Sequence, residues 1–450
     1  MFLHRSLLSN AESALSDSRR FRIVLLEVAA LALLLRLIMV SVSPPLPCDC
    51  LVPLSDAGDY DHLARTMLSD FRYSAPSGEP TAFRPPVFPV FLAVLYAFFG
   101  AGNLLAVAVV QAFLGALNCA LAGAVARAGG LSRGAAVLAA AGFALYPAFI
   151  LQAAQILTEV LARTQLLLAV WVLLLAQNRR SLPLYGVAGG LMALAILNKS
   201  ALGAAVPMLG LYVLWFGGAD WKGRFSAAAA YALPAALILG GWTARNAVAS
   251  EGRFIPISTN FPITFAQGLT QHSLYTNIWY GEERELLQVP DDYLKLTQLR
   301  AYAGIEDEMA TGARWAAEAK AYIAADPGFF AILTVRKAAH FWSPIIRNAL
   351  PQQIVAFLSM APVLILGTWG LIAMLRRGGE ARRLALLALL IGATVTLPYA
   401  ISQPDVRYRL ALVDPLWIVM TAGVVGAAGA RRIAKREHQD SAMTLERLTP

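Results

Sequence analysis

The chain has 450 residues, of which 58% are hydrophobic and only 14% charged, and its mean hydropathy is +0.58. Soluble domains carry about 25% charged residues, so this composition excludes an ordinary soluble protein and predicts an all-α polytopic membrane protein. The net charge is +9, but the basic residues gather in short clusters beside apolar segments. This pattern indicates membrane topology and lipid headgroups and excludes nucleic acid as the main partner.

Ten segments approach the length of about 20 apolar residues that a membrane-spanning helix needs. They are 21–42, 103–126, 134–151, 155–177, 182–197, 200–217, 226–244, 352–375, 384–401 and 408–430. No small-residue cleavage site follows the first of them, so we expect a retained helix there and no signal peptide. An eleventh segment, 84–99, is apolar but short.

Positive charge decides how segment 84–99 is placed, because cytoplasmic loops carry an excess of Lys and Arg. If this segment does not cross, the basic clusters all fall on one side, which we take as the cytoplasm; they lie at 19–22, 127–133, 179–180, 222–224, 376–383 and 431–436. We therefore expect 84–99 to be a re-entrant or interfacial helix on the outer face of a plasma (inner) membrane.

The predicted organisation has three parts. They are a cytoplasmic tail at 1–20, a membrane domain at 21–430 and a second cytoplasmic tail at 431–450. The membrane domain contains two outer regions, 43–102 and 245–351. The second is too long for a structureless connection, and we expect helix from Glu306 to Lys337 with a break at Asp326-Pro327-Gly328.

An acidic stretch follows the first span: Ser55-Asp56-Ala57-Gly58-Asp59-Tyr60-Asp61-His62. Carboxylates crowded at a membrane edge are typical of a catalytic site. Asp56 could equally cap a helix, with Asp59 in its first turn. Asp59 lies three residues after Asp56, on the same face if the stretch is helical, and is the rival base. Tyr60 either contacts a ligand or anchors the chain at the interface.

Several cations stand on the predicted outer side, against the positive-inside rule: Arg84, Lys199, Arg245, Arg347, Arg407 and Arg409. Arg84 precedes an apolar helix, where the helix dipole disfavours a cation and an anionic ligand would offset that cost. The planar fork of arginine suits phosphate oxygens, so a lipid-linked phosphate is the predicted partner. The alternative is that these side chains reach the headgroup layer or pair with Asp and Glu.

Motifs for other chemistries are missing from the sequence. No His, Cys and Asp spacing fits a zinc site, and there is neither a P-loop nor a dinucleotide fingerprint. We therefore expect no cofactor and no nucleotide-sugar donor, while a carboxylate-bound divalent metal stays open.

Five short motifs occur in a recognisable order: Asp56-Ala57-Gly58-Asp59-Tyr60 with Ala64, Arg84-Pro85-Pro86, Thr158-Glu159, Trp242-Thr243-Ala244-Arg245-Asn246 and Arg407-Tyr408-Arg409. In this order and membrane placement the chain resembles the GT-C glycosyltransferases over roughly 20–430. The resemblance is to the bacterial branch of lipid A aminoarabinose transferases and protein O-mannosyltransferases. The chain lacks the Asp-Glu pair of eukaryotic mannosyltransferases, since Ala57 follows Asp56.

The resemblance implies a membrane enzyme that transfers a sugar, with inversion, from a polyprenyl-phosphate donor to a hydroxyl of a glycan, lipid or protein on the periplasmic face. A sugar phosphate already carries a good leaving group, so one carboxylate suffices as base. The resemblance assigns that role to Asp56, with Asp59 as the alternative. Expected substrate-binding residues are Tyr60, Arg84, Glu159, Arg245, Asn246, Arg407 and Arg409. The competing hypotheses are a transporter or flippase of a lipid-linked sugar and a non-catalytic subunit with the same fold.

Overall fold

The computed structural model describes residues 2–45, 56–270, 299–345 and 350–429, with side chains from residue 18 onward. Within this part the chain is helical and contains no β-strand, and one isolated bridge joins Ser74 and Pro80. The predicted outer cation Arg347 and the tail 431–450 lie outside the described residues. The helices are α1 (Phe2–Val42), α2 (Asp56–Asp70), α3 (Val87–Phe99), α4 (Leu104–Ala128), α5 (Arg133–Leu145), α6 (Pro147–Leu151), η1 (Gln152–Ala154), α7 (Glu159–Arg179), α8 (Leu182–Ile196), η2 (Ser200–Leu202), α9 (Ala205–Phe216), α10 (Trp221–Ala249), α11 (Phe261–Gln267), η5 (Leu299–Ala301), α12 (Ile305–Ala325), α13 (Pro327–Phe341), α14 (Leu350–Arg377), α15 (Gly379–Ile401) and α16 (Val406–Leu412).

Six of these helices are long and apolar enough to cross a membrane: α1 from Ser18, α4, α7, α10, α14 and α15. Two bent pairs raise the number of candidate spans among the described residues to eight. The pairs are Arg133–Leu145 with Pro147–Ala154, bent by 56°, and Val406–Leu412 with Asp414–Gly429, bent by 58°. The predicted all-α polytopic class is confirmed. Two of the ten expected spans, 182–197 and 200–217, form apolar helices shorter than 18 residues.

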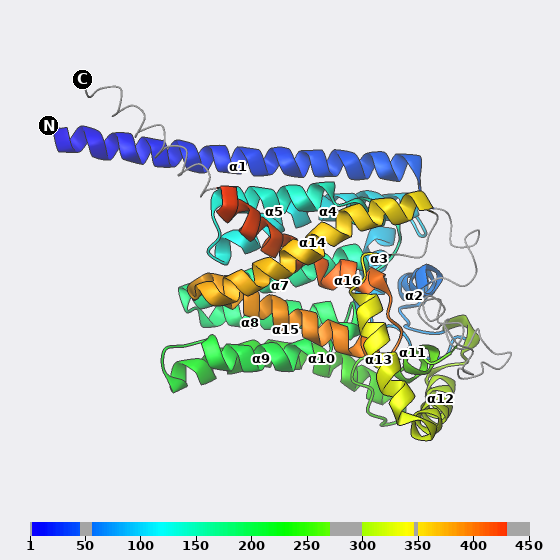
Figure 1. The fold of residues 1–450 in the computed structure, drawn as a ribbon. Helices are drawn as coiled ribbons and strands as arrows, with labels where there is room; N and C mark the ends of the chain where they lie inside the picture. Colours follow the sequence, from blue (N-terminus) through cyan, green and yellow to red (C-terminus); the bar gives the residue numbers. More distant parts are fainter. Residues whose placement is uncertain (1, 46–55, 271–298, 346–349, 430–450) are drawn as a thin grey trace.

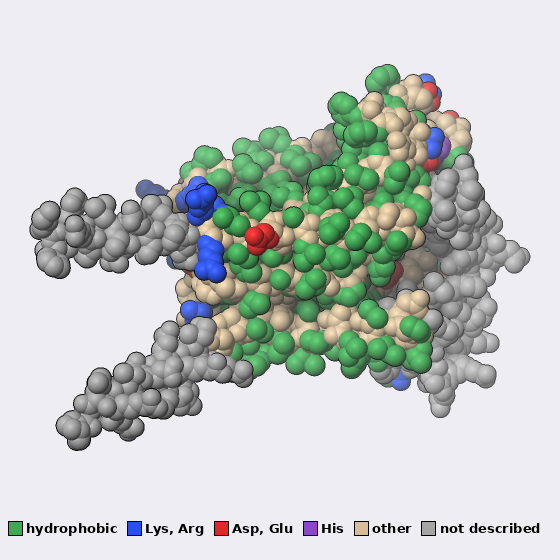
Figure 2. All heavy atoms as spheres, turned by 90° about the horizontal axis from the view of Figure 1, so that it is seen from above, with side chains coloured by type: hydrophobic (Ala, Val, Ile, Leu, Met, Phe, Trp, Pro, Cys, Tyr) green, Lys and Arg blue, Asp and Glu red, His purple; other side chains and the backbone are tan. Residues whose placement is uncertain are grey.

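The long helices run side by side as a bundle whose two ends differ (Figure 1). The turns between α9 and α10 and between α14 and α15 lie at the end near the start of α1, and the helix ends beside them carry Lys222, Arg224 and the pairs 376–377 and 382–383. Figure 2 shows basic side chains gathered at this end, which we call the basic end. Helices α2, α11, α12 and α13 cover the opposite end, which we call the loop end.

The loop end joins the two regions that the sequence predicts to be outside. Helices α12 and α13 correspond to the expected helical stretch, and Asp326 separates them by accepting a hydrogen bond from the Phe329 N–H at 2.8 Å. A buried apolar cluster packs the first region against the second through Leu63, Phe83, Ile263, Trp315 and Leu333. Helix α3 packs chiefly on α2, and its interfacial placement stays a prediction.

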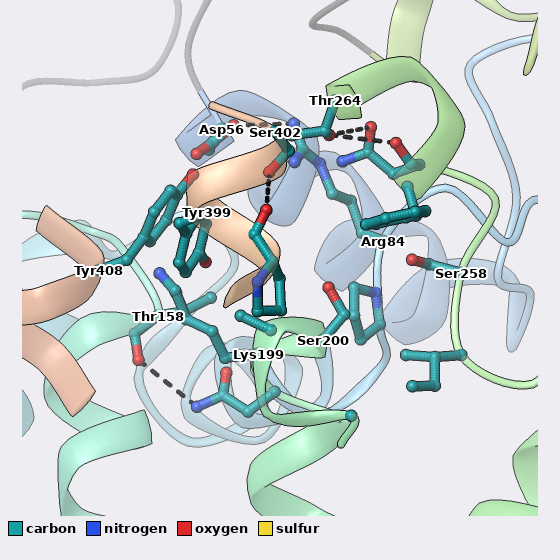
Figure 3. Close-up of a pocket in the computed structure, with 18 of the residues that line it drawn as sticks. Asp56, Arg84, Thr158, Lys199, Ser200, Ser258, Thr264, Tyr399, Ser402 and Tyr408 are labelled. Carbon is teal, nitrogen blue, oxygen red and sulfur yellow. Dashed lines mark hydrogen bonds and ion pairs between the residues drawn. The ribbon is translucent and has the colours of Figure 1, made fainter. Parts of the chain in front are cut away.

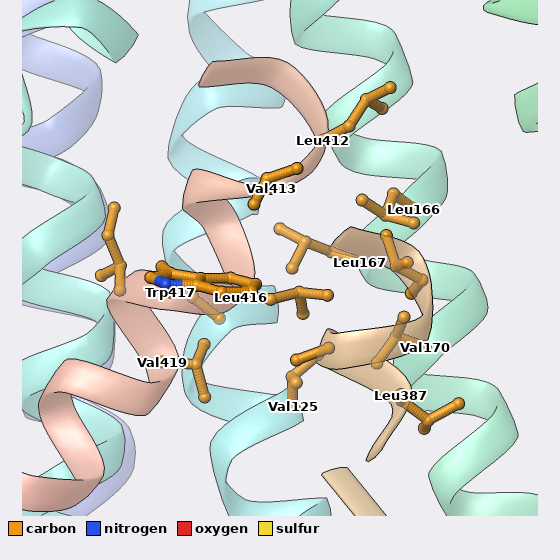
Figure 4. Close-up of a cluster of buried hydrophobic side chains, with 14 of the residues drawn as sticks. Val125, Leu166, Leu167, Val170, Leu387, Leu412, Val413, Leu416, Trp417 and Val419 are labelled. Atoms are coloured by element: carbon orange, nitrogen blue, oxygen red, sulfur yellow. The ribbon is translucent and has the colours of Figure 1, made fainter. Parts of the chain in front are cut away.

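The bundle core contains side chains from distant parts of the chain. Figure 4 shows part of it, with α7 facing the last helices: Val125, Leu166, Leu167, Val170, Leu387, Leu412, Val413, Leu416, Trp417 and Val419. Helices in a bilayer associate mainly through close packing, which small residues permit. At Gly189 of α8, an added Cβ would lie 1.9 Å from the Tyr231 carbonyl oxygen of α10. Any larger residue there would push these two helices apart.

Candidate active site

A cavity of about 310 Å³ lies at the loop end, where segments far apart in the sequence meet (Figure 3). Its lining comes from the start of α2, the residues before α3, the break between α8 and η2, the segment around α11, the end of α15 and the start of α16. The charged residues among the described lining are Asp56, Arg84, Lys199 and Arg407. The structure thus brings three expected outer cations and one carboxylate to the same cavity.

Asp56 is the first residue of α2 and holds two arginines at once. Arg84 Nη2 donates to its Oδ1 at 2.8 Å, and Arg407 Nη2 donates to its Oδ2 at 2.9 Å. Burial alone would raise the pKa of Asp56, but Arg84, Arg407 and Lys199 together hold it well below the usual range. Asp56 is therefore an ionised carboxylate between cations.

Asp59, the rival base, lies behind Arg84 and does not line the cavity. Arg84 Nε and Nη2 both donate to Asp59 Oδ2, at 3.0 and 2.7 Å, and the Leu299 N–H donates to Oδ1 at 3.1 Å. Both carboxylate oxygens are engaged, and only 7% of the side chain is exposed, against 27% for Asp56. Asp59 fixes the orientation of Arg84.

Glu159 forms the second half of the charge cluster. It is the first residue of α7, and its Oε1 accepts from Lys199 Nζ at 2.7 Å and lies 3.2 Å from Arg407 Nε. Lys199 also donates to Thr158 Oγ1 at 3.0 Å. Lys199 is absent from our expected binding set, although its charge on the predicted outer side was the signal that could have placed it there.

Aromatic rings enclose the cations. Tyr408 accepts from Arg407 Nη2 at 3.1 Å and stacks on Tyr399 with ring centroids 4.2 Å apart. The Lys199 ammonium lies 4.3 Å from the Tyr408 ring centre. Tyr60 lines the cavity and lies under Arg84, with the guanidinium carbon 5.6 Å from its ring centre. Such contacts stabilise cations away from water.

Arg245 and Asn246, which the sequence places among the substrate-binding residues, do not line this cavity. Arg245 donates to the carbonyl oxygens of Thr81 at 2.6 Å and Tyr73 at 2.8 Å. Asn246 is fully buried and donates to the Ile255 carbonyl at 3.0 Å. Arg245 therefore braces the loop that leads to Arg84, and Asn246 holds the segment that follows α10.

Glu308 of α12 braces the same loop, and nothing in the sequence pattern singles it out. It accepts hydrogen bonds from the Thr81 hydroxyl, from the Ala82 N–H at 3.2 Å and from the Thr259 hydroxyl at 2.7 Å. Burial raises the pKa of Glu308. The Tyr73 hydroxyl completes the support by donating to the Arg84 carbonyl at 2.8 Å.

Arg409 also lies away from the cavity, although it is only two residues from Arg407. It is fully buried, pairs with Asp414 at 3.0 Å and donates to the carbonyls of Phe341 and Ser343 at 2.8 and 2.7 Å. Residues two apart lie on nearly opposite faces of a helix. Arg409 therefore ties α13 to the last helices while Arg407 faces the cavity.

A second cavity, of about 540 Å³, shares Arg407 with the first. It lies between α6, α14 and α16, and its described lining is mostly apolar: Pro147, Ala148, Leu151, Gln152, Gln155, Pro351, Gln352, Val355, Ala356, Ser359, Met360, Asp405, Val406, Arg407 and Leu410. Neighbouring side chains of α14 are exposed, among them Ile354 and Leu358. Among the described residues, no group of three or more His, Cys, Asp or Glu could hold a metal ion.

Comparison with known proteins places this arrangement in context. Residues 83–242 match the family model for dolichyl-phosphate-mannose-protein mannosyltransferase. No curated protein matches the sequence. Among solved structures, the apo oligosaccharyltransferase of Archaeoglobus fulgidus is similar, with a TM-score of 0.56 and 14% identity. So is AglB from the same organism in complex with an inhibitory peptide and a dolichol-phosphate, with a TM-score of 0.56 and 15% identity.

Both archaeal matches cover 94% of this chain and 52% of the solved chain, so this chain spans about half their length. ArnT from Cupriavidus metallidurans, bound to undecaprenyl phosphate, aligns over 91% of this chain and 80% of its own, with 16% identity and a TM-score of 0.38. The family match and the archaeal structures confirm the resemblance that the motifs predict: the chain has the fold of the GT-C membrane glycosyltransferases.

Proposed function

We propose that this chain transfers a sugar from a polyprenyl-phosphate donor to an acceptor hydroxyl, with inversion, and that Asp56 is the general base. The observation that carries the proposal is the meeting of Arg84 and Arg407 at Asp56, with Lys199 and Glu159 beside them, where a polar cavity adjoins an apolar one. A lipid-linked sugar phosphate has three parts that match this arrangement. Its apolar chain suits the apolar cavity, its phosphate suits the cations at the junction, and its sugar suits the polar cavity.

Arg407 is the proposed contact for the donor phosphate. It lines both cavities, and its Nη1 makes no hydrogen bond to the described residues. The apolar cavity would hold the first isoprene units, which could enter past the exposed side chains of α14. The similar archaeal structure was solved with a dolichol-phosphate, which agrees with a donor of this class.

The proposed step forms one bond and breaks one. The acceptor oxygen attacks the anomeric carbon, the bond from that carbon to the phosphate oxygen breaks, and Asp56 takes the acceptor's proton. The leaving polyprenyl phosphate keeps the electron pair, and the arginines stabilise its charge. A donor phosphate would also draw Arg84 and Arg407 from Asp56, so the pKa of Asp56 would rise from its depressed value and make it a better base.

The contacts favour Asp56 over Asp59 in this role. Asp56 lines the cavity with 27% of its side chain exposed, whereas Asp59 does not line it and is 7% exposed. The reaction would take place at the loop end. Since the basic turns lie at the other end, the positive-inside rule supports placing the loop end on the periplasmic face of the inner membrane.

Transfer of radiolabelled sugar from membrane lipids by the purified protein tests the proposal. Asp56→Asn keeps the size of the side chain, and Arg84 and Arg407 retain Asp59 and Glu159 as partners, so we expect a folded protein. Its transfer rate should fall by at least about a hundredfold, the low end for a lost general base.

Asp61→Asn is the matched control, because Asp61 lies on the same helix but pairs with Arg65 and the Tyr96 hydroxyl outside the cavity. It should keep most of the activity. Full activity of a folded Asp56→Asn variant would exclude Asp56 as the base. A larger loss for Asp59→Asn than for Asp56→Asn would assign the base to Asp59.

A further inference from the structure

We propose that the transferred sugar is uncharged, a neutral hydroxylated sugar and neither an amino sugar nor a uronic acid, and that Ser200, Ser258, Asn260 and Thr264 select it. The inference rests on the proposed function, because it concerns the sugar-binding part of the same cavity. The supporting observation is the set of neutral polar side chains that line the wall of the cavity away from Arg407.

That wall presents neutral polar groups. Figure 3 shows Ser200 and Ser258 across the cavity from Tyr399 and Tyr408. The hydroxyls of Ser200 and Ser258 make no hydrogen bond to the described residues, so they are available to a ligand. Hydroxyls both donate and accept, which matches the hydroxyls of a neutral sugar.

Asn260 and Thr264 extend this surface from the start of α11. The Thr264 hydroxyl donates to the Asn260 carbonyl at 3.1 Å and lies 3.2 Å from its Oδ1. The Asn260 amide nitrogen keeps both protons for a ligand, since no described residue accepts from it. This corner therefore offers donors and acceptors without a formal charge.

A charged sugar would find no partner in the described lining. An ammonium group needs a carboxylate, yet the single carboxylate in the described lining is Asp56, which the proposed function assigns to the acceptor's proton. A uronate needs a free cation, but the proposed function assigns Arg84 and Arg407 to the donor phosphate, and Lys199 is paired with Glu159 at 2.7 Å. Burying an unpaired charge is strongly unfavourable, so the cavity discriminates against both classes.

Binding of four synthetic lipids to the purified full chain, at neutral pH and fixed salt, tests this inference. They are farnesyl phosphate and its esters with glucose, with 6-amino-6-deoxyglucose and with glucuronic acid. We expect the glucose ester to bind at least several-fold more tightly than farnesyl phosphate, and the two charged esters to bind no more tightly than farnesyl phosphate.

The outcomes separate this inference from the proposed function. Tight binding of farnesyl phosphate together with a preference for the amino or the uronic ester would overturn the neutral-sugar inference alone. If none of the four lipids binds, the proposed function fails and the inference fails with it.

Two variants at Ser258 test the residue assignment. Ser258→Ala removes one neutral hydrogen bond, so affinity for the glucose ester should fall by a factor of about 2 to 10. Ser258→Asp supplies a free carboxylate, so affinity for the amino ester should rise by about tenfold or more. Farnesyl phosphate should bind both variants like the parent, which also reports that they are folded.

Ser77→Asp is the matched control, because Ser77 is exposed at the same end and contacts the Ala303 carbonyl outside the cavity. It should leave all four affinities unchanged. If Ser258→Asp leaves the order of the four lipids as in the parent, or if Ser77→Asp changes it equally, Ser258 does not face the sugar and the assignment is wrong.

Discussion

The sequence groups Arg245 with Arg407 as phosphate ligands, whereas the structure gives them different partners, and alanine variants should separate them. Arg407 lines both cavities and pairs with Asp56 and Glu159. The Arg245 guanidinium donates hydrogen bonds to the carbonyl oxygens of Tyr73 and Thr81. We therefore expect Arg407→Ala to weaken donor binding and Arg245→Ala to lower stability.

The expected loss of affinity in Arg407→Ala follows from the hydrogen bond that Arg407 would make to the donor phosphate. A hydrogen bond to a charged group contributes about 1.5–3 kcal/mol, which corresponds to a loss of roughly one to two decades in affinity. The variant also leaves Asp56 Oδ2 without its 2.9 Å partner. Asp56 would then be neutralised by Arg84 alone and would repel the phosphate more strongly, so this loss is a lower bound.

For Arg245→Ala we expect the loss in the free energy of unfolding. Two carbonyl groups lose a charged donor, and an unsatisfied buried group costs about 1–3 kcal/mol. The Thr81 carbonyl belongs to the loop that Glu308 also holds, so part of the local structure should persist. Donor affinity should change less than about threefold because no direct contact is lost.

Two measurements at fixed salt check both expectations: the dissociation constant for farnesyl phosphate and the midpoint of thermal unfolding. Salt must be fixed because it screens exposed charges. Arg65→Ala serves as control, since Arg65 is half-exposed, pairs with Asp61 and lies outside both cavities. Parent-like affinity of Arg407→Ala, or an equal loss of affinity in a folded Arg245→Ala variant, would refute the reasoning.

Three further predictions concern topology, pH and stability. A cysteine placed at Ser77 in a cysteine-free background should react with a membrane-impermeant reagent in intact cells. One placed at Glu380, in the first turn of α15, should react only after permeabilisation, and the reverse result would invert the topology. Because the pKa of Asp56 is depressed without donor and should rise when a phosphate draws its arginines away, the acid limb of kcat should lie at higher pH than that of kcat/KM, and coincident limbs would contradict this coupling. The Lys337 amine is buried without a hydrogen-bond partner among the described residues, and burial lowers its pKa to about 7. An unfolded lysine titrates at about 10.4, so between these two pKa values the unfolded state binds more protons and stability falls as pH falls. Lys337→Met should therefore raise the unfolding midpoint most at pH 7 and below. A gain that does not shrink toward pH 10 would exclude this cause.

The sequence by itself determines the class of the protein and the arrangement of charge along it. Hydropathy identifies the long helices, and clusters of basic residues mark the turns at one end, because both depend on composition within short segments. The break at Asp326 is equally local, since an aspartate before a proline caps the next helix. Asp56, Arg84 and Arg407 stand out for the same reason, as charges beside apolar runs.

Only the tertiary structure decides which charges meet. Arg407 and Arg409 look alike in the sequence, but they point to nearly opposite sides of a seven-residue helix, one toward Asp56 and the other toward Asp414. The pairing of Lys199 with Glu159 joins residues 40 positions apart. Such contacts depend on how each helix is rotated and bent, and that is set by packing across the whole bundle. The local sequence does not determine those rotations. For this reason the sequence predicts which charged residues matter but not which residues they pair with.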